Sequence, residues 1–283
     1  MGPIRQYGQV FDAVAENYDA YRSGYPATLV DLALERGGLE PGSRVVEVGS
    51  GTGKLTEALV EPGLVVDAVE PGANMIAAAR RRVGDDASVT FHLGRFEDLD
   101  LPEGAFDAVF SGTAFHWIEP HVGWTKVARL LKPRGLLALL VLSGIREPHT
   151  AAYEDEILAV GAKYAPGLDR HPSRELEVTL AGVGERRGNV SAVWDWLMSD
   201  GRHGLAVPEA EGLFDDVDVA VDLREDERTA DQIMALFKTT SLWFRIDPDK
   251  RDALEAEDRE VIARHGGVIR STLATFLMTA RKN

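Results

Sequence analysis

The chain has 283 residues, of which 45% are apolar and 27% charged, and its formal net charge is −15 at pH 7. A chain this acidic repels phosphate backbones and anionic membranes. Neither nucleic acid nor a membrane surface is therefore expected as a partner. The absence of cysteine excludes disulfides and thiolate sites. No apolar signal core stands at the start, and the longest apolar run, residues 136–142, is too short for a bilayer, so a cytoplasmic location is expected.

Two helices are expected before the first strand. Side chains at helical spacing predict a short helix within residues 7–22, and a second helix is predicted over residues 26–36. Residues 45–48 are apolar and β-branched apart from Glu47, which predicts a buried parallel strand.

Three glycines follow this strand at alternate positions, Gly49, Gly51 and Gly53, and a helix over residues 54–60 comes next. Glycine lets the chain turn sharply and lets a ligand press against bare backbone, so this stretch predicts a cofactor cradle. A dinucleotide fingerprint would need a further glycine where the chain has Lys54. A phosphate-binding P-loop is excluded as well, because its first glycine and its final serine or threonine are both missing.

Strands and helices alternate through the rest of the chain. The strands predicted up to residue 142 are 64–69, 89–93, 106–111 and 136–142, with helices at 72–82 and 119–132. Beyond residue 214 the pattern predicts strands at 217–223 and 268–280, with helices at 229–237 and 248–265. This order predicts an α/β fold: a doubly wound, mostly parallel seven-stranded sheet with helices on both faces and a helical cap inserted before the last two strands.

Three parts of the chain are expected to differ in role. Residues 1–142 form the cofactor-binding core with an N-terminal covering segment, and residues 215–283 complete the sheet. Residues 143–214 form a helical insertion that would cap the carboxyl ends of the strands; its predicted helices are 151–164, 173–181 and 191–198. The insertion carries Trp194, Trp196 and the basic residues Arg146, His149, Arg170, His171, Arg174, Arg186 and Arg187. These residues could form a substrate lid, or they could be packing tryptophans and surface charges. The second alternative is preferred for any one of them.

The stretch acidic-x-Gly-x-Gly-x-Gly, with Glu47 at the strand end, resembles motif I of the class I S-adenosylmethionine-dependent methyltransferases. Two further segments resemble small-molecule members of this family: Phe-Asp-x-Val-Ala-x-x-Tyr-Asp-x-Tyr-Arg, from Phe11, and Glu-Pro-x-x-x-Met, from Glu70. The sequence Ala-Phe-His-Trp at 114–117 is similar to a branch that includes the trans-aconitate methyltransferases. The resemblance is strong over about residues 10–142 and weak beyond 215.

This resemblance implies S-adenosylmethionine as the cofactor. It implies that Glu47 lies near the ammonium group of the methionine part and that Glu70 takes the ribose hydroxyls at the carboxyl end of its strand. The cofactor-binding residues that follow from the resemblance are Tyr18, Arg22, Glu47, Gly49, Ser50, Gly51, Gly53, Glu70, Pro71, Asn74, Met75, Phe96, Glu97, Ser111 and Gly112. Packing is an equal alternative for Tyr18 and Met75, as is a solvated side chain for Arg22.

The chain departs from the family pattern at one position. Many members have an aspartate that reads the adenine amino group where this chain has Arg95, and Phe96 and Glu97 are the proposed substitutes. His116 is the histidine placed to act as a general base, and packing beside Trp117 is the alternative. The base-flipping signature of nucleic-acid amino methyltransferases is missing after the strand at 106–111.

The sequence therefore predicts a methyltransferase that acts on a small organic acceptor, on oxygen and by analogy a carboxylate. No metal is expected, since no cluster of residues has ligand spacing. An aminopropyl transferase on the same fold and a non-catalytic cofactor-binding or interaction protein stay open as alternatives, whereas Lys54 disfavours a dehydrogenase. The sequence does not indicate the oligomeric state.

Overall fold

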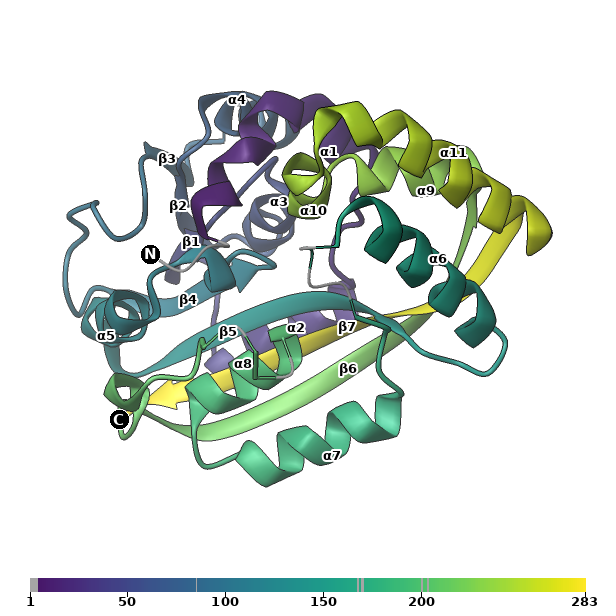
Figure 1. Ribbon diagram of the computed structural model, residues 1–283. Coiled ribbons are helices and arrows are strands. Elements are labelled where there is room, and N and C mark those ends of the chain that lie inside the picture. Colours follow the sequence, from purple (N-terminus) through teal and green to yellow (C-terminus); the bar gives the residue numbers. More distant parts are fainter. Residues whose placement is uncertain (1–4, 85, 167, 169–170, 200, 203) are drawn as a thin grey trace.

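The computed structural model describes residues 5–84, 86–166, 168, 171–199, 201–202 and 204–283. Its centre is a seven-stranded sheet with the strand order β3-β2-β1-β4-β5-β7-β6 (Figure 1). Strands β1 to β5 pair in parallel, whereas β7 runs antiparallel to both of its neighbours. The strands are β1 (Arg44–Val48), β2 (Val65–Glu70), β3 (Val89–Leu93), β4 (Phe106–Gly112), β5 (Leu131–Ile145), β6 (Phe214–Thr229) and β7 (Val268–Lys282).

Helices cover both faces of this sheet, which confirms the predicted fold class. None of the described helices has the length and apolar character that crossing a membrane requires. The helices are α1 (Ala15–Tyr21), α2 (Ala27–Gly37), α3 (Lys54–Val60), α4 (Ala73–Val83), α5 (Pro120–Leu130), α6 (Ala151–Tyr164), α7 (Leu176–Arg186), α8 (Val190–Ser199), α9 (Ala230–Phe237), α10 (Ser241–Arg245) and α11 (Pro248–Arg264), together with the 3₁₀ helices η1 (Arg5–Val14), η2 (Phe115–Trp117) and η3 (Pro208–Ala210).

The central strands build two cores, because alternate residues of a strand point to opposite faces of the sheet. In β5, Leu136 and Leu140 pack with α2 and α3 on one face. Leu137 and Leu139 pack with α5 and α8 on the other face. The continuous apolar run of this strand, which is what made it recognisable in the sequence, is therefore explained by helices on both sides.

Helices α6 to α8 form the predicted insertion between β5 and β6. Helix α7 packs on α8, and α8 lies against β6 and β7. Trp194 of α8 is buried in the core, with its ring centroid 6.4 Å from that of Phe115. Helix α6 packs against α11 instead. Arg170, one of the basic residues noted in the insertion, lies outside the described residues.

A second set of helices, α9 to α11, lies between β6 and β7. Helix α9 contacts α1, and α10 contacts η1, so elements from the two ends of the chain meet above the parallel strands (Figure 1). This meeting point lies over the carboxyl ends of the strands, where ligands bind in open α/β sheets.

Most predicted elements are confirmed to within a few residues, and α3, β3 and α6 have the predicted bounds. Two strands are longer than predicted. β6 continues beyond residue 223 to Thr229, because it keeps pairing with β7 although its side chains there are largely exposed and charged, so the apolar alternation ends before the hydrogen bonding does. β5 begins at Leu131 rather than 136, because Leu131 pairs with Phe106 before an irregularity in the register and Leu136 resumes the pairing with Ala108. The strand therefore includes the turn-like residues 132–135.

Candidate functional site

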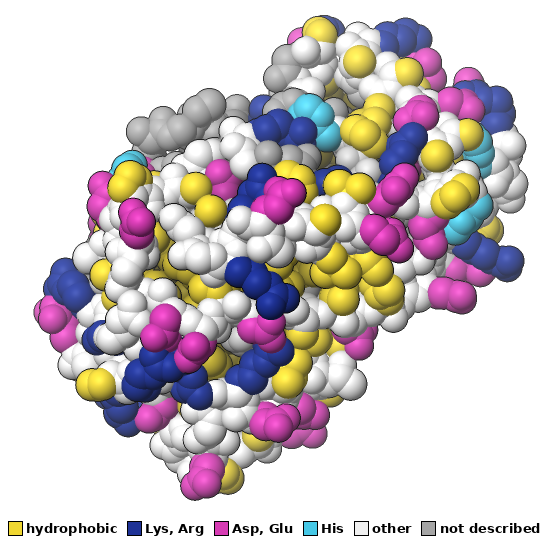
Figure 2. All heavy atoms as spheres, turned by 90° about the horizontal axis from the view of Figure 1, so that it is seen from below, with side chains coloured by type: hydrophobic (Ala, Val, Ile, Leu, Met, Phe, Trp, Pro, Cys, Tyr) yellow, Lys and Arg dark blue, Asp and Glu magenta, His cyan; other side chains and the backbone are white. Residues whose placement is uncertain are grey.

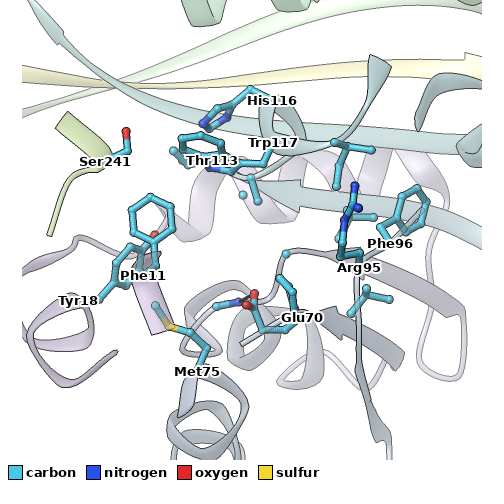
Figure 3. Close-up of a pocket in the computed structure, with 18 of the residues that line it drawn as sticks. Phe11, Tyr18, Glu70, Met75, Arg95, Phe96, Thr113, His116, Trp117 and Ser241 are labelled. Atoms are coloured by element: carbon cyan, nitrogen blue, oxygen red, sulfur yellow. Dashed lines mark hydrogen bonds between the residues drawn. The ribbon is translucent and has the colours of Figure 1, made fainter. Parts of the chain in front are cut away.

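Two adjoining cavities lie at the carboxyl ends of β1, β2 and β4, one of about 540 Å³ and one of about 80 Å³. The larger one falls in the size range in which proteins enclose small molecules. Figure 3 shows this larger cavity, with Glu70 and Met75 along one side of the view and His116 and Trp117 along the other. The residues that line both cavities are Tyr18, Arg22, Gly49, Gly51, Gly112 and Thr113.

The glycine loop forms part of the wall of both cavities. Gly49, Gly51 and Gly53 all adopt positive φ angles, of 73°, 54° and 83°. This is a conformation that glycine adopts far more readily than other residues. A Cβ atom on Gly49 would also stand 2.4 Å from the Cβ atom of Ala114, so the chain needs bare backbone at this point.

Glu70 ends β2 and is only 8% exposed. Its Oε2 accepts the N–H of Gly51 at 2.9 Å, and its Oε1 accepts the N–H of Gly72 at 2.9 Å. Burial raises the pKa of Glu70, and the two N–H donors oppose that rise. Each carboxylate oxygen has a second lone pair, so Glu70 can accept two further hydrogen bonds from a ligand in the larger cavity.

Glu47 lines the smaller cavity and is 1% exposed. Its Oε2 accepts a hydrogen bond of 2.6 Å from the hydroxyl of Thr56. Burial raises the pKa of Glu47 to about 7, although the Thr56 hydroxyl opposes the rise. Ser50 lines the same cavity, and its Oγ is buried without a hydrogen-bond partner in the described part of the chain. A carboxyl group and an unused hydroxyl thus face a small polar space.

We expect Glu47→Gln to change how stability depends on pH. The pKa of Glu47 rises from 4.5 to about 7 on folding, so the folded chain holds this proton between those values while the unfolded chain has released it. The stabilisation from this proton is complete below pH 4.5 and is lost as the pH rises through about 7. In urea titrations without ligand, the variant should gain stability relative to the wild type as the pH rises across this window. A difference between the two that stays constant with pH would contradict the prediction.

The N-terminal segment is fastened over the larger cavity by two aspartates. Asp12 Oδ1 accepts the N–H of Asn74 at 2.7 Å and of Met75 at 3.2 Å, so it caps the N-terminus of α4 from a distant part of the chain. Asp19 forms an ion pair of 2.7 Å with Arg82 of α4. These contacts keep η1 and α1 against α4.

The N-terminal segment also contacts the C-terminal helices. Arg22 donates from Nε to the hydroxyl of Thr239 at 3.1 Å and from Nη2 to its carbonyl at 3.2 Å. Phe11 lies edge-on to Tyr18 and to Trp117, with ring centroids 5.8 Å and 5.6 Å apart. A continuous set of aromatic rings therefore runs from α1 through η1 to η2 along the cavity wall.

The loop after β3 is braced by charged side chains. Glu97 Oε1 accepts Nη2 of Arg95 at 2.9 Å and the N–H of Glu119 at 3.1 Å. Lys126 of α5 donates its Nζ to the carbonyls of Phe96 at 2.6 Å, Glu97 at 3.3 Å and Leu99. Arg95, which replaces the aspartate of the family pattern, therefore lines the cavity as the partner of Glu97.

The end of β4 approaches the N-terminal segment closely. A Cβ atom on Gly112 would stand 2.4 Å from the hydroxyl oxygen of Tyr25, so only glycine fits there. The same hydroxyl donates to Thr113 Oγ1 at 3.3 Å. Thr113 has a positive φ of 51°, a strained conformation for a β-branched residue. His116 follows in η2, with its ring centroid 4.6 Å from that of Trp117 and the two planes tilted by 45°.

All but three of the residues nominated from the sequence line at least one of the two cavities. The exceptions have structural contacts of their own. Ser111 Oγ donates to the carbonyl of Val48 at 2.7 Å, and Asn74 Nδ2 donates to Asp12 Oδ2 at 3.0 Å. Gly53 lets α3 approach α4, since a Cβ atom there would stand 3.0 Å from Ala79.

The sequence missed several residues of the cavity wall. Phe11 begins a segment that resembles the family and Trp117 follows the nominated His116, so the sequence did hold a usable signal for both. The segment 240–242, around the start of α10, gave none, because a helix of this length has no readable periodicity. Among the described residues of 143–214, Met198 lines the larger cavity, so the insertion supplies little of its wall.

Comparison with known proteins places these residues in a family context. The family model described as a methyltransferase domain matches residues 46–139. An uncharacterized methyltransferase of Anoxybacillus flavithermus is 30% identical over 193 residues, which are 63% of this chain and 86% of that protein. An uncharacterized methyltransferase of Mycobacterium tuberculosis is 35% identical over 130 residues, which are 46% of this chain and 51% of that protein. The chain thus spans about half the length of the first curated relatives that it matches.

A solved structure shares the fold. It is an S-adenosylmethionine-dependent methyltransferase from Geobacter sulfurreducens in complex with S-adenosylhomocysteine, with a TM-score of 0.50 and 17% identity over 94% of this chain and 96% of that one. At this identity the likeness supports the architecture alone.

Proposed function

The chain belongs to the class I S-adenosylmethionine-dependent methyltransferases, and on that premise we propose that it moves a methyl group from S-adenosylmethionine to an oxygen atom of a small organic acceptor. The observation that carries the proposal is the pairing of the glycine loop with Glu70 at the carboxyl ends of β1 and β2. A carboxylate with free lone pairs beside bare backbone suits a ribose diol, whereas its negative charge disfavours a pyrophosphate.

The residues present fit the cofactor. A Cβ atom on Gly49 or Gly112 would meet a neighbour at 2.4 Å, so both positions are kept clear beside the cavity. The unpartnered Oγ of Ser50 and the buried carboxyl of Glu47 provide a polar end for an amino-acid tail. The residues that would hold the cofactor are, for the methionine part, Tyr18, Arg22, Glu47, Gly49, Ser50 and Gly51; for the ribose, Glu70; and for the adenine, Pro71, Met75, Phe96 and Glu97.

In this proposal, three of the nominated residues do not contact the cofactor but hold the cavity wall in place. Gly53 and Asn74 set the positions of α3 and α4, and Ser111 ties β4 to β1. Gly112 provides the open backbone next to which the methyl group would lie.

When bound, the cofactor supplies a methyl group on a positively charged sulfur, which the acceptor oxygen attacks in line with the sulfur that leaves. The protein contributes alignment of the acceptor and exclusion of water, which together are worth up to about 7–11 kcal/mol. The covering segment that Asp12 and Asp19 fasten over the cavity serves the second purpose. His116 lines the cavity and is the candidate general base for an acceptor hydroxyl.

The acceptor is proposed to be a small molecule rather than a nucleic acid. The chain carries a net charge of −15. On the face shown in Figure 2, Lys and Arg side chains lie interspersed with Asp and Glu, without a continuous basic field. Neither feature favours the binding of a nucleic-acid phosphate backbone.

The test combines binding and turnover. We expect S-adenosylhomocysteine to bind in calorimetric titrations, and radiolabelled S-adenosylmethionine to transfer its methyl group to members of a panel of hydroxylated and carboxylated small molecules. No binding at millimolar ligand would refute the cofactor assignment. Binding without turnover of any acceptor would favour a non-catalytic protein, and turnover with only the decarboxylated cofactor would identify an aminopropyl transferase.

The same assay tests His116. Methyl transfer from a sulfonium depends on alignment more than on a base, so His116→Ala should reduce turnover by less than about tenfold while cofactor affinity is unchanged. A loss of about a thousandfold at unchanged affinity, with the acidic limb of the pH–rate profile removed, would instead make His116 the base.

A further inference from the structure

The larger cavity extends beyond the residues assigned to the cofactor. Its far part is lined by His116 and Trp117 of η2, by Met198, and by Ser241 and Leu242 of α10. In Figure 3, Ser241, His116 and Trp117 lie on the side of the cavity opposite Glu70 and Met75. His116 and Trp117 belong to the Ala-Phe-His-Trp segment that resembles the family, whereas Met198 and α10 lie outside the segments that carry the resemblance. Helix α10 comes from the helices between β6 and β7.

The wall of this part carries aromatic rings and an aliphatic side chain. Phe11 and Trp117 are half-buried, line the cavity and fix one another edge-on at 5.6 Å, and the His116 ring leans on Trp117 at 4.6 Å. Leu242 is half-buried as well and belongs to α10, which contacts η1. Fixed aromatic and aliphatic surfaces of this kind favour a planar, apolar ligand, because ring contacts add to area burial.

The charged side chains described around the larger cavity leave no unpaired charge for a charged acceptor to bind once the cofactor is counted. Arg22 and Arg95 line the larger cavity together with Glu70, Glu97 and Glu119, so among the described residues the wall carries one more negative charge than positive. S-adenosylmethionine brings one net positive charge at neutral pH, which offsets the net negative charge of this wall. Arg95 is paired with Glu97 at 2.9 Å. A charged acceptor would therefore be buried without a partner, which is costly.

One hydroxyl remains available on this wall. Ser241 lines the cavity, and its Oγ makes no hydrogen bond within the described part of the chain, unlike its neighbour Thr240, whose hydroxyl donates to the carbonyl of Phe237 at 2.7 Å. Together with the His116 ring it gives this otherwise apolar part a polar feature that can bind an acceptor hydroxyl.

Building on the proposed function, we propose that the space between Trp117 and α10 is the acceptor subsite, and that it takes a flat, uncharged aromatic molecule that presents a hydroxyl group for methylation. The oxygen nucleophile is then a phenol-type hydroxyl rather than a carboxylate. The hydroxyl proton leaves as the oxygen–methyl bond forms and the carbon–sulfur bond breaks, and His116 or solvent takes that proton. In this proposal, selectivity for the acceptor rests mainly with η2 and α10, and the insertion at 143–214 contributes Met198.

The test uses three matched flat probes that differ in charge: 2-naphthol, 2-naphthoate and 2-naphthylmethylamine. The protein is first saturated with sinefungin, a cofactor analogue whose amine keeps the positive charge at the position of the sulfur, and each probe is then titrated by calorimetry. We expect 2-naphthol to bind at least about tenfold more tightly than either charged probe. Tighter binding of the carboxylate or the ammonium probe would overturn the proposal, and so would the failure of all three at millimolar concentration.

Variants separate this proposal from the cofactor assignment. Leu242→Ala should weaken the binding of 2-naphthol about tenfold, and Ser241→Ala should weaken it about fivefold. The affinity for sinefungin should stay within about twofold of the wild type. Leu180→Ala, on the exposed side of α7, is the matched control and should change neither. If sinefungin itself does not bind, the proposed function fails; if it binds and Leu242→Ala has no effect on 2-naphthol, only the acceptor subsite is refuted.

Discussion

Replacing Glu70 with alanine is expected to weaken the binding of S-adenosylhomocysteine by about a hundredfold or more, because each hydrogen bond to a charged group contributes about 1.5–3 kcal/mol and a ribose diol would make two. The carboxylate is already oriented for this task. Gly51 and Gly72 hold its two oxygens at 2.9 Å, so little freedom is lost when a ligand binds. Calorimetric titration of the wild type and the variant measures the effect directly.

Two comparisons distinguish a lost contact from a damaged fold. Burial raises the pKa of Glu70, which means that the ionised carboxylate is not a large source of stability in the empty protein. Glu70→Ala should therefore stay folded at neutral pH. Glu61→Ala, which removes an exposed glutamate just after α3, is the matched control and should bind as the wild type does. If Glu70→Ala retains affinity within about tenfold of the wild type, the ribose assignment is wrong.

The residues of the cavity wall that the sequence indicated are those whose positions local chemistry determines. Gly49 follows a β-branched strand, and its positive φ and crowded Cβ position are requirements of the turn itself. Glu70 ends the neighbouring strand, so its place beside the glycine loop follows from the parallel order of β1 and β2. In both cases a few consecutive residues carry the information.

The remainder depends on contacts between distant segments. Asp12 caps α4, Arg22 binds Thr239, and α10 closes the far end of the cavity only because the β6–β7 pairing brings it there. No local pattern encodes these meetings. For Trp194 the structure agrees with the preferred alternative, packing rather than contact with a substrate. Its side chain lies in the core with residues of β5 and β7, where the apolar face of α8 is buried.

Arg95 illustrates a departure that the sequence revealed but could not interpret. The family pattern implied a lost adenine contact, and the structure adds that Arg95 orients Glu97 from the same loop. Oε1 of Glu97 accepts both the guanidinium of Arg95 and the N–H of Glu119, and Glu97 lines the larger cavity. The proposed adenine contact is therefore assigned to a carboxylate two positions further along the chain than in the family pattern.

The second large effect is expected at the glycine loop. Gly49→Ala places a residue with a side chain at a φ of 73°, and its Cβ would stand 2.4 Å from the Cβ atom of Ala114. A left-handed conformation costs about 1–2 kcal/mol, and overpacking adds about 1–3 kcal/mol, so we expect a loss of about 2–5 kcal/mol in the free energy of unfolding. Cofactor affinity should fall with it, because the shifted backbone lines both cavities.

Gly51 and Ala114 provide matched comparisons for this prediction. Gly51 has a φ of 54° but open space around its Cβ position, so Gly51→Ala should show the conformational cost alone, about 1–2 kcal/mol. Ala114→Gly removes the atom with which Gly49→Ala collides, and the double variant should recover the overpacking part, measured as the coupling energy in a double-mutant cycle by urea unfolding. Equal losses of unfolding free energy at Gly49 and Gly51, with no coupling to Ala114, would contradict this prediction. The glycine loop would then relax freely, and its close contact with the start of η2 would not determine the shape of the cofactor site.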